Sequence, residues 1–304
     1  MMGMYRLAVV RSGDRDTTVV EQDGRLLPVA TLLGDTATLG ALDDLAPLLQ
    51  DWARWSNALD AAVATAGERF RSEGSPAADA RFRPPLKAPG KLICIGANYH
   101  DHIAEMPIPI VPTYPYSFLK PASNTLRGSG EAVVAPAGVE MFDWEAELAV
   151  IIGTTCKDVS EADALSVIAG YANFNDFSAR DWIASRPPIG VDWVRHKGYD
   201  GFAPFGPYLL PARFVADPQD LPVRLSVNGI VKQDSSTAQM VYGVAPIIAH
   251  LTSIMTLSPG DVIATGTPAG VGHGRKPPEY LKPGDEVRME IGALGELVTP
   301  IIAP

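Results

Sequence analysis

The sequence predicts an α+β fold that is rich in β-strand, with peripheral helices around a mixed sheet and a small N-terminal α/β domain. After residue 90, many short apolar runs are bounded by Gly, Pro or Asp, which is typical of strands. These runs do not alternate regularly with helices, so a doubly wound parallel sheet is not indicated. The prolines and glycine of residues 81–91 (RFRPPLKAPGK) predict an extended connector. We therefore divide the chain into residues 1–85 and 86–304.

The N-terminal part begins with strand-forming residues. Residues 4–11 and 16–21 are rich in Val, Thr and Leu, and both stretches predict strands. The dipeptide Asp23-Gly24 is a turn signal before a further short strand at residues 25–29. Apolar residues then recur every three or four positions, so residues 43–72 are predicted to be largely helical.

The second part carries the main set of strand-like runs. Asn228-Gly229 separates two of them and predicts a tight hairpin. Two stretches are expected to be helical, residues 160–171 and residues 243–255. The predicted strands are residues 91–96, 116–120, 145–153, 223–229, 261–266 and 285–292.

Composition excludes some classes of function. The chain has 304 residues, of which 46% are hydrophobic, enough for a sizeable core. Acids outnumber bases by 35 to 25, so no basic excess favours nucleic-acid binding, although local cations could still bind an anionic substrate. No apolar run approaches the ~20 residues that span a bilayer, and no signal peptide is evident. We expect a soluble, cytoplasmic protein whose two cysteines, Cys94 and Cys156, are reduced and mostly buried.

The most informative stretch has acids at alternating positions before an apolar run, Asp143-Trp-Glu145-Ala-Glu147. In a strand, residues two apart project from the same face, so Glu145 and Glu147 would point together. Two parallel carboxylates repel each other unless a cation lies between them, and oxygen ligands suit Mg²⁺, Mn²⁺ or Ca²⁺. A solvated acidic face on an edge strand is the alternative. Asp176, about thirty residues later in the polar pair Asn175-Asp176, could complete a set of three carboxylates.

A histidine and a glutamate follow the first strand of the second part. His102 and Glu105 are three residues apart, which places them on one face of a helical turn. A His held by a carboxylate is a serviceable general base. His100 competes for the role of base, Asp101 for the role of orienting acid, and a polar surface turn is the simpler interpretation.

Two further segments can contribute to a site. Lys197 lies in a Gly-rich, aromatic context that could partly bury its charge. Residues 265–272 (TGTPAGVG) are glycine-rich without matching a nucleotide-binding fingerprint, and their backbone N–H groups could form an anion nest. The sequence has no Gly-x-Ser-x-Gly elbow and no Cys and His cluster with zinc spacing, which argues against those two chemistries.

Taken together, these segments resemble the fumarylacetoacetate hydrolase family. Eight motifs occur in the family's order over residues 91–303, and residues 1–85 look like the variable N-terminal domain of many members. The motifs are GANYHDHIAE, PYSFLKP, DWEAELAVIIG, GYANFNDFSARD, KGYDGFAPFGP, VNGIVKQ, LSPGDVIATGTPAGVG and LKPGDEV.

The resemblance implies a mixed β-sheet roll with few helices, usually a homodimer, that binds a divalent cation, often Mg²⁺. It implies that the metal ligands are Glu145, Glu147 and Asp176. It also implies a His-Glu dyad on a mobile lid, at His102 and Glu105. Further site residues that it implies are Lys197 as the active-site lysine, Arg180 and Thr267 as substrate-binding residues, and Lys120 and Gln233 as further pocket positions.

The resemblance implies an enzyme acting on a small anionic oxo acid. The leading expectation is a hydrolase that cleaves a C–C bond in a 1,3-diketone or acylpyruvate, in aromatic-compound catabolism. Tautomerisation of a hydroxymuconate-type dienoate or decarboxylation of oxaloacetate could use the same site, because both depend on an enolate. A non-catalytic binding protein is a minor alternative. The proline-rich run at residues 106–115 departs from the family pattern and is expected to shape the pocket.

Overall fold

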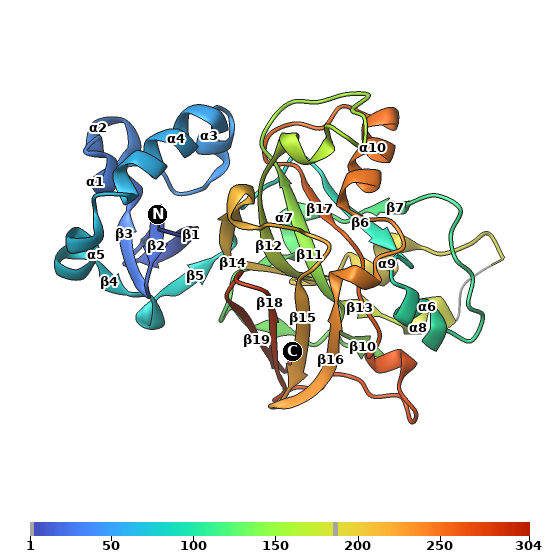
Figure 1. Cartoon of the computed structure of the whole chain (residues 1–304). Coiled ribbons are helices and arrows are strands. Elements are labelled where there is room, and N and C mark those ends of the chain that lie inside the picture. The colour runs from blue at the N-terminus through green and yellow to red at the C-terminus, as the bar shows by residue number, and fades with distance from the viewer. Residues whose placement is uncertain (1–2, 185–187) are drawn as a thin grey trace.

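A computed structural model describes residues 3–184 and 188–304. Within these residues the helices are short and the strands dominate, as the sequence predicts (Figure 1). The helices are α1 (Val29–Leu33), α2 (Thr36–Leu39), α3 (Ala46–Leu49), α4 (Trp52–Val63), α5 (Gly67–Glu73), α6 (His100–Glu105), α7 (Ala122–Thr125), α8 (Asp181–Ala184), α9 (Trp193–Lys197) and α10 (Val244–Ile254).

The strands of the described residues form one large mixed sheet, a second sheet and a small two-stranded ribbon. The large sheet contains β1 (Arg6–Ser12), β2 (Arg15–Gln22), β3 (Arg25–Pro28), β4 (Ser75–Pro76), β5 (Arg81–Arg83), β6 (Leu92–Gly96), β7 (Tyr116–Leu119), β8 (Leu126–Arg127), β11 (Ala146–Ile152), β12 (Ile168–Asn175), β14 (Ala203–Pro211) and β17 (Val262–Ala264). The second sheet contains β9 (Val133–Val134), β15 (Pro222–Val227), β16 (Ile230–Ser236), β18 (Glu286–Ile291) and β19 (Glu296–Ile302). The ribbon pairs β10 (Phe142–Asp143) with β13 (Ser178–Ala179).

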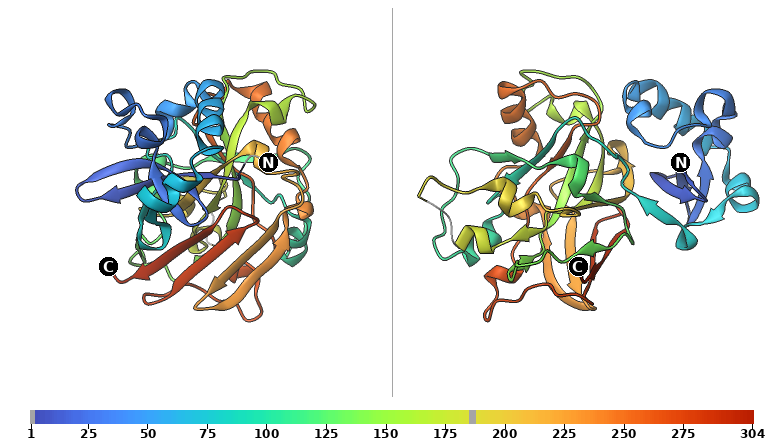
Figure 2. Two further views of the ribbon diagram at one scale, coloured as in Figure 1. Left: turned by 60° about the vertical axis from the view of Figure 1, so that its left-hand side comes forward. Right: turned by 180° about the vertical axis from the view of Figure 1, so that it is seen from behind.

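The order along the large sheet is β4-β3-β2-β1-β14-β12-β11-β17-β6-β7, with β5 beside β1 and β8 beside β14. Antiparallel pairs predominate, but β17 runs parallel to β6, and β14 runs parallel to β8. The second sheet has the order β16-β15-β18-β19-β9, and Figure 2 shows its long strands side by side. This arrangement is the β-rich mixed architecture with peripheral helices that the sequence predicts.

The N-terminal turns and helices follow the predicted pattern. Asp23 (φ 50°) and Gly24 (φ 78°) join β2 to β3, in the left-handed region that an Asp-Gly turn favours. The helical stretch predicted at residues 43–72 is present as α3, α4 and α5, and Pro47 lies in the first turn of α3, where it is tolerated. The hairpin at Asn228-Gly229 also forms, between β15 and β16.

One expected helix is wrong. Residues 160–171 contain a single 3-10 turn at Ala164–Val167, and β12 begins directly after it at Ile168. The strand is buried along its whole length and pairs with β11 on one side and β14 on the other. Its β-branched and aromatic residues fit a doubly buried strand, and these tertiary partners outweigh the weak helical pattern.

The two largest of the three hydrophobic core clusters among the described residues meet at the central strand β11. Leu148 and Val150 face one core, whereas Ala149 and Ile151 face the other. Because side chains alternate across a strand, this run is apolar on both faces, as expected for a strand buried between two layers. The strand therefore forms a rigid base for the acidic residues at its N-terminal end.

The N-terminal segment joins the rest of the molecule through its sheet. Leu7 of β1 is in register with Leu209 of β14, and one hydrophobic core contains residues from α3, α4, β1 and β11. Figure 1 shows the N-terminal helices and strands, in blue, on one side of the molecule. The division of the chain into two domains at residue 85 remains a prediction. Strand β1 lies before this position and its partner β14 lies after it, so the large sheet contains strands from both parts.

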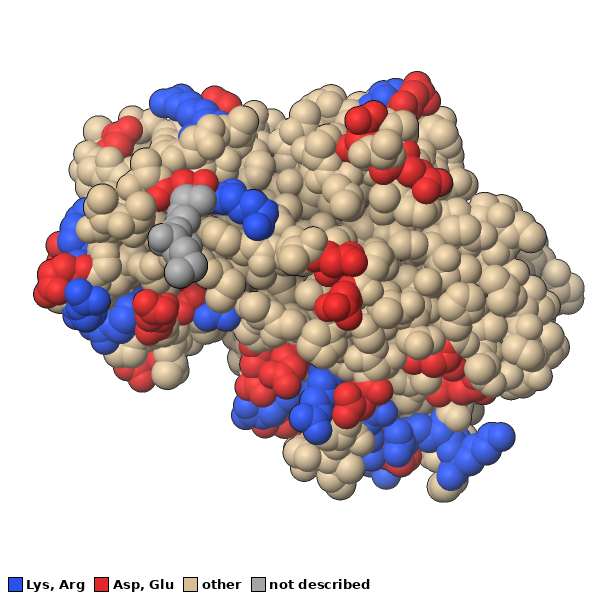
Figure 3. Space-filling view, in the orientation of Figure 1, with Lys and Arg blue, Asp and Glu red and all other residues tan. Residues whose placement is uncertain are grey.

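On the face drawn in Figure 3, acidic and basic side chains are interspersed in small groups, without an extended basic stripe. None of the helices among the described residues is long and apolar enough to cross a membrane. Cys94 and Cys156 are both buried and both free, as the sequence predicts.

Candidate active site

Strand pairing brings the three predicted carboxylates together. β11 and β12 are antiparallel, with Ala146 opposite Asn175, so the chain positions just outside this pair, Glu145 and Asp176, are neighbours. The Asp176 N–H donates to the Glu145 carbonyl at 3.0 Å. Oxygen atoms of Glu145, Glu147 and Asp176 all lie within 4.8 Å of one another, and the three residues are buried. The alternative of a solvated acidic face is therefore wrong.

Three buried cations surround this group. Lys197 Nζ lies 2.5 Å from Glu145 Oε2 and 2.6 Å from Asp176 Oδ2. Arg180 Nη2 lies 2.5 Å from Glu145 Oε1, and Lys120 Nζ lies 2.5 Å from Asp176 Oδ1. Burial alone would raise the pKa of Glu145, but Lys197 and Arg180 hold the pKa of Glu145 below its usual range.

Glu147 differs from its neighbours. Its Oε2 accepts the Gly266 N–H at 2.8 Å, and no ion pair to Glu147 is present among the described residues. Burial, together with the adjacent Asp176 and Glu145, raises the pKa of Glu147 well above its usual range. Glu147 is thus a buried carboxylate without a cationic partner in the described part of the chain, and it lies next to two other carboxylates. A divalent cation stabilises such an arrangement, so these residues fit a hard metal ion.

Formal charge supports the same conclusion. Four carboxylates (Asp143, Glu145, Glu147, Asp176) and three cations (Lys120, Arg180, Lys197) are each at most 7% exposed, which leaves a formal charge of −1 when all are ionised. A divalent cation would change this charge to +1, and a site of that charge attracts an anion.

The His-Glu pair forms within α6. His102 Nδ1 lies 2.7 Å from Glu105 Oε1, and the other carboxylate oxygen of Glu105 accepts the Gly270 N–H at 2.9 Å. Because a carboxylate only accepts, Nδ1 carries the proton and Nε2 is left as an acceptor. The competing residues do not form this pair. His100 is exposed, and the carboxylate of Asp101 accepts hydrogen bonds from the His102 backbone N–H at 2.8 Å and from Ser235 Oγ at 2.6 Å.

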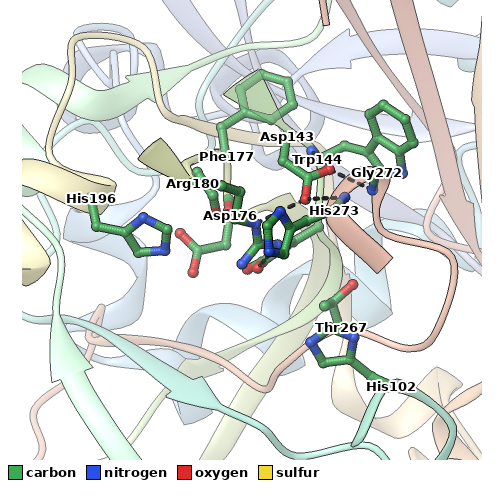
Figure 4. Close-up of polar contacts among 12 residues, drawn as sticks. His102, Asp143, Trp144, Asp176, Phe177, Arg180, His196, Thr267, Gly272 and His273 are labelled. Atoms are coloured by element: carbon green, nitrogen blue, oxygen red, sulfur yellow. Dashed lines mark hydrogen bonds and ion pairs between the residues drawn. The ribbon is translucent and has the colours of Figure 1, made fainter. Parts of the chain in front are cut away.

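A cavity of about 150 Å³ joins these groups. The same cavity is lined by the metal-ligand candidates, by His102 and by Arg180, Lys197 and Thr267. Figure 4 shows how His102, Asp176, Arg180 and Thr267 are arranged around this region. Two aromatic residues, Phe118 and Trp193, form another part of the cavity wall. Their rings stack on each other, with centroids 4.2 Å apart.

Two predicted pocket residues lie behind the cavity wall. Lys120 contacts Asp176 and the carbonyls of Phe177 and Phe202, and it is not among the residues that line the cavity. Gln233 donates to Thr267 Oγ1 at 2.8 Å and accepts the Ala146 N–H at 3.0 Å. Both side chains therefore orient residues that face the cavity.

The glycine-rich loop approaches the site closely. Gly266 (φ 93°) presents its N–H to Glu147, and a Cβ there would lie 2.9 Å from the Asn98 Cβ. Both the left-handed backbone and the close approach require glycine. The loop's amides bind protein carboxylates at this position, at Gly270 and at Gly272, so they stabilise the site's acids.

Sequence reasoning missed the roles of two residues. Asp143 accepts the N–H groups of Gly272 and His273 and lies 2.8 Å from Arg180 Nε, so it joins the loop to the arginine (Figure 4). Its place in the alternating acids was a signal that could have identified it. His196 also lines the cavity, and its only sequence signal is its position beside Lys197.

Comparisons with known proteins agree with this geometry. The family model "Fumarylacetoacetate (FAA) hydrolase C-terminal" matches residues 91–302. A 2,4-didehydro-3-deoxy-L-rhamnonate hydrolase of Sphingomonas sp. (strain SKA58) is 45% identical over 224 residues, 73% of this chain and 75% of that protein. The mitochondrial oxaloacetate tautomerase FAHD2B of Homo sapiens is 43% identical over 227 residues, 75% of this chain and 71% of that protein.

A solved structure extends the similarity to nearly the whole chain. The maleylpyruvate hydrolase of Sphingobium sp. SYK-6, in complex with manganese (II) and pyruvate, superposes with a TM-score of 0.76 at 30% identity, over 98% of this chain and 99% of that one. The matched region contains the acidic cluster, the dyad and the loop described above. The chain belongs to the fumarylacetoacetate hydrolase family.

Proposed function

We propose that this protein is a divalent-metal-dependent hydrolase that cleaves a C–C bond in a small 1,3-diketone acid of the acylpyruvate type. The observation that carries the proposal is the shared cavity. It is lined by three carboxylates that could hold a metal ion and, from a different element, by a histidine that a glutamate orients. Metal polarisation and a positioned base are the two requirements for attack of water on such a substrate.

Glu145, Glu147 and Asp176 would hold the metal, with Mg²⁺ as the first candidate and Mn²⁺ or Ca²⁺ as alternatives. A bound divalent cation supplies Lewis acidity toward the substrate's oxygens and balances enolate charge. The manganese (II) and pyruvate in the Sphingobium relative support this assignment of ion class and ligand class. Glu147 supports it independently, because it is the buried carboxylate with a raised pKa and without a cationic partner among the described residues.

His102 is the general base of the proposed hydrolysis. Its Nδ1–H donates to Glu105, so Nε2 can remove a proton from water while the glutamate stabilises the imidazolium. The resulting hydroxide forms a bond to the distal carbonyl carbon of the substrate. The C–C bond then breaks, its electron pair leaves as the pyruvate enolate, and the imidazolium returns the proton to the enolate carbon. The products are pyruvate and a carboxylic acid.

The remaining cavity residues bind and orient the substrate. The Thr267 hydroxyl accepts the Gln233 N–H, so its own O–H is free to donate to a substrate carboxylate. Arg180 and Lys197 add positive charge beside the cavity, and that charge favours both the substrate anion and the enolate. Lys120 and Gln233 position Asp176 and Thr267 from behind.

Tautomerisation or decarboxylation at the same site is the second candidate function. The human relative is named as an oxaloacetate tautomerase, and such a reaction needs the polarised enolate without attack of water. A binding protein without turnover is a third possibility, and the complete set of cavity residues argues against it. The homodimer that the family resemblance implies is also part of the proposal, and light scattering on the purified protein tests it.

Product analysis after metal removal tests the function. The protein is stripped with EDTA and assayed on 2,4-dioxopentanoate and on oxaloacetate, with and without added Mg²⁺ or Mn²⁺. We expect equimolar pyruvate and acetate from 2,4-dioxopentanoate only when metal is restored. Enol–keto conversion of oxaloacetate without cleavage of the diketone would instead identify a tautomerase. Equal cleavage before and after stripping would contradict metal dependence.

A further inference from the structure

A second, larger cavity adjoins the catalytic cavity that contains the three carboxylates. It is lined by residues of the segments 102–108, 180–183 and 271–278, and we call it the outer cavity. Its volume is about 910 Å³, against about 150 Å³ for the catalytic cavity. Four residues line both cavities, namely His102, Met106, Arg180 and Ile183. The two spaces therefore meet beside the proposed general base.

Apolar side chains form much of the wall of the outer cavity. They belong to Met106, Pro107, Ile108, Ile183, Val271 and Pro278. Ile108 is 71% exposed, so part of this apolar wall faces water. An apolar group placed against the wall would remove both surfaces from water, which is favourable in proportion to the area covered. The outer cavity therefore suits an apolar part of a ligand.

The charged side chains of the outer cavity are already paired or exposed. Arg275 Nε lies 2.8 Å from Glu279 Oε1, and Arg180 is bound by the two carboxylates described above. Lys276 is exposed to solvent. Burial, followed by the charge of Arg180, lowers the pKa of His273, so its ring is neutral at physiological pH. Among the lining residues that the structure describes, none offers an enclosed cation without a carboxylate partner for an acidic ligand group.

The proposed reaction determines which part of the substrate reaches the outer cavity. The metal ligands would hold the pyruvoyl end in the catalytic cavity, and His102 directs water at the distal carbonyl. A cavity of about 150 Å³ holds a ligand of about the size of benzene, which leaves little room beyond the pyruvoyl group and that carbonyl. The rest of the acyl group begins at the carbonyl beside His102, and His102 lines both cavities. The acyl group therefore extends into the outer cavity.

We propose that the outer cavity binds the acyl group of the substrate, so that the enzyme selects acylpyruvates whose acyl group is a bulky apolar chain or ring. This inference rests on the proposed function and specifies the acyl part of its substrate. The segment Met106-Pro107-Ile108 belongs to the proline-rich run that departs from the family pattern. Because proline restricts the backbone, this part of the wall loses little conformational freedom when a ligand binds.

The experiment compares kcat/KM for three acylpyruvates on the metal-loaded protein. The first, 2,4-dioxopentanoate, carries an acetyl group. The second, 2,4-dioxooctanoate, adds three methylenes to it, and the third, 2,4-dioxooctanedioate, has a carboxylate in place of the terminal methyl of the second. A fully buried methylene corresponds to about a fourfold change, so we expect wild-type protein to prefer 2,4-dioxooctanoate over 2,4-dioxopentanoate by about 10- to 50-fold. We expect it to prefer 2,4-dioxooctanoate over the dioate as well, because the apolar wall does not solvate a carboxylate.

Three substitutions in the proline-rich run test the location of the acyl group. Ile108→Asp places a charge on the wall of the outer cavity and should lower the preference for 2,4-dioxooctanoate over 2,4-dioxopentanoate by about fivefold or more. Ile108→Leu keeps the wall apolar and should keep most of the preference. Ile110→Asp is the matched control, because Ile110 is 67% exposed, lies in the same run and lines neither of the two cavities. Circular dichroism verifies that each variant is folded.

The outcomes separate this inference from the proposed function. If wild-type protein cleaves 2,4-dioxopentanoate as well as 2,4-dioxooctanoate, or prefers 2,4-dioxooctanedioate, the outer cavity does not select an apolar acyl group. An unchanged preference in Ile108→Asp, or an equal loss in Ile110→Asp, would contradict the assignment of the acyl group to this cavity. If wild-type protein cleaves none of the three compounds, the proposed function itself is wrong, and the inference that rests on it is wrong with it.

Discussion

Replacing Glu147 with glutamine should have opposite effects on the metal-free and metal-loaded protein. The substitution keeps the shape of the side chain and can keep the hydrogen bond from Gly266, but it removes a buried negative charge. Without metal, that charge lies within 4.8 Å of the Glu145 and Asp176 oxygens. Coulomb's law at an effective dielectric constant of ~20 gives ~3.5 kcal/mol of repulsion for each such pair, offset in part by Lys197. The metal-free variant should therefore be at least as stable as the wild type.

With metal, the same change should be unfavourable, because one of three anionic ligands is lost. A tenfold or greater loss of metal affinity, ~1.4 kcal/mol or more, is the expected minimum. At a metal concentration of about 100 times the wild-type Kd, binding stabilises the wild type by ~2.7 kcal/mol and a tenfold weaker variant by ~1.4 kcal/mol. For a chain of 304 residues, these values correspond to thermal shifts of about 4 °C and about 2 °C.

The pH dependence of unfolding gives a second test of the sign of this stability difference between the metal-free wild type and Glu147→Gln. The folded-state pKa of Glu147 is raised above its usual value of 4.5, so the unfolded chain releases this proton first as the pH rises. The stability of the metal-free wild type should therefore fall, relative to the Gln variant, as the pH increases above 4.5. Below 4.5 the carboxyl is protonated in both states, and the difference should disappear.

Calorimetric titration with Mg²⁺ and Mn²⁺, together with thermal melts after EDTA treatment, measures these effects. Glu161→Gln is the matched control, because Glu161 is an exposed glutamate that does not line the cavity. Wild-type metal affinity in Glu147→Gln would refute the metal site. A large loss of metal-free stability would refute the conclusion that Glu147 lacks a compensating cation.

Three further predictions concern the residues around the site. Glu105→Gln should reduce hydrolysis by less than the ~10²–10⁴ expected for loss of the base, because the imidazole of His102 remains, and a larger effect in steady-state kinetics would assign Glu105 a more direct role. Residues 99–115 should exchange amide hydrogens more slowly when Mg²⁺ and oxalate are both bound, and identical exchange with and without them would exclude a lid. Asp143→Ala should cost about 3–5 kcal/mol in urea unfolding, because it leaves Arg180 without one of its buried partners, and an unchanged midpoint would contradict that ion pair.

Local spacing explains what the sequence could predict of the site. Glu145 and Glu147 are two residues apart at the start of a strand, and His102 and Glu105 are three apart in a helical turn. In both cases regular backbone geometry determines the relative direction of the side chains. The strand prediction for residues 145–153 succeeded for a similar reason, since a continuous apolar run is typical of a strand buried on both faces.

Contacts between distant segments explain what the sequence could not predict. Asp143 accepts hydrogen bonds from the backbone amides of Gly272 and His273, about 130 positions later in the chain. No local sequence pattern predicts this contact. Lys120 occurs in a motif that resembles a pocket segment, but the pairing of β6 with β7 brings it behind Asp176. The error at residues 160–171 has the same origin, because β12 is specified by the strands on either side of it.

The rate of 2,4-dioxopentanoate cleavage by metal-loaded His102→Ala tests the central claim most directly. Because Ala removes the imidazole without touching Glu145, Glu147 or Asp176, metal affinity in calorimetry should stay at the wild-type value. We predict that pyruvate release falls by ~10²–10⁴, the usual cost of losing a general base. Cleavage at the wild-type rate by this variant would contradict the account, because another group would then have to activate the water.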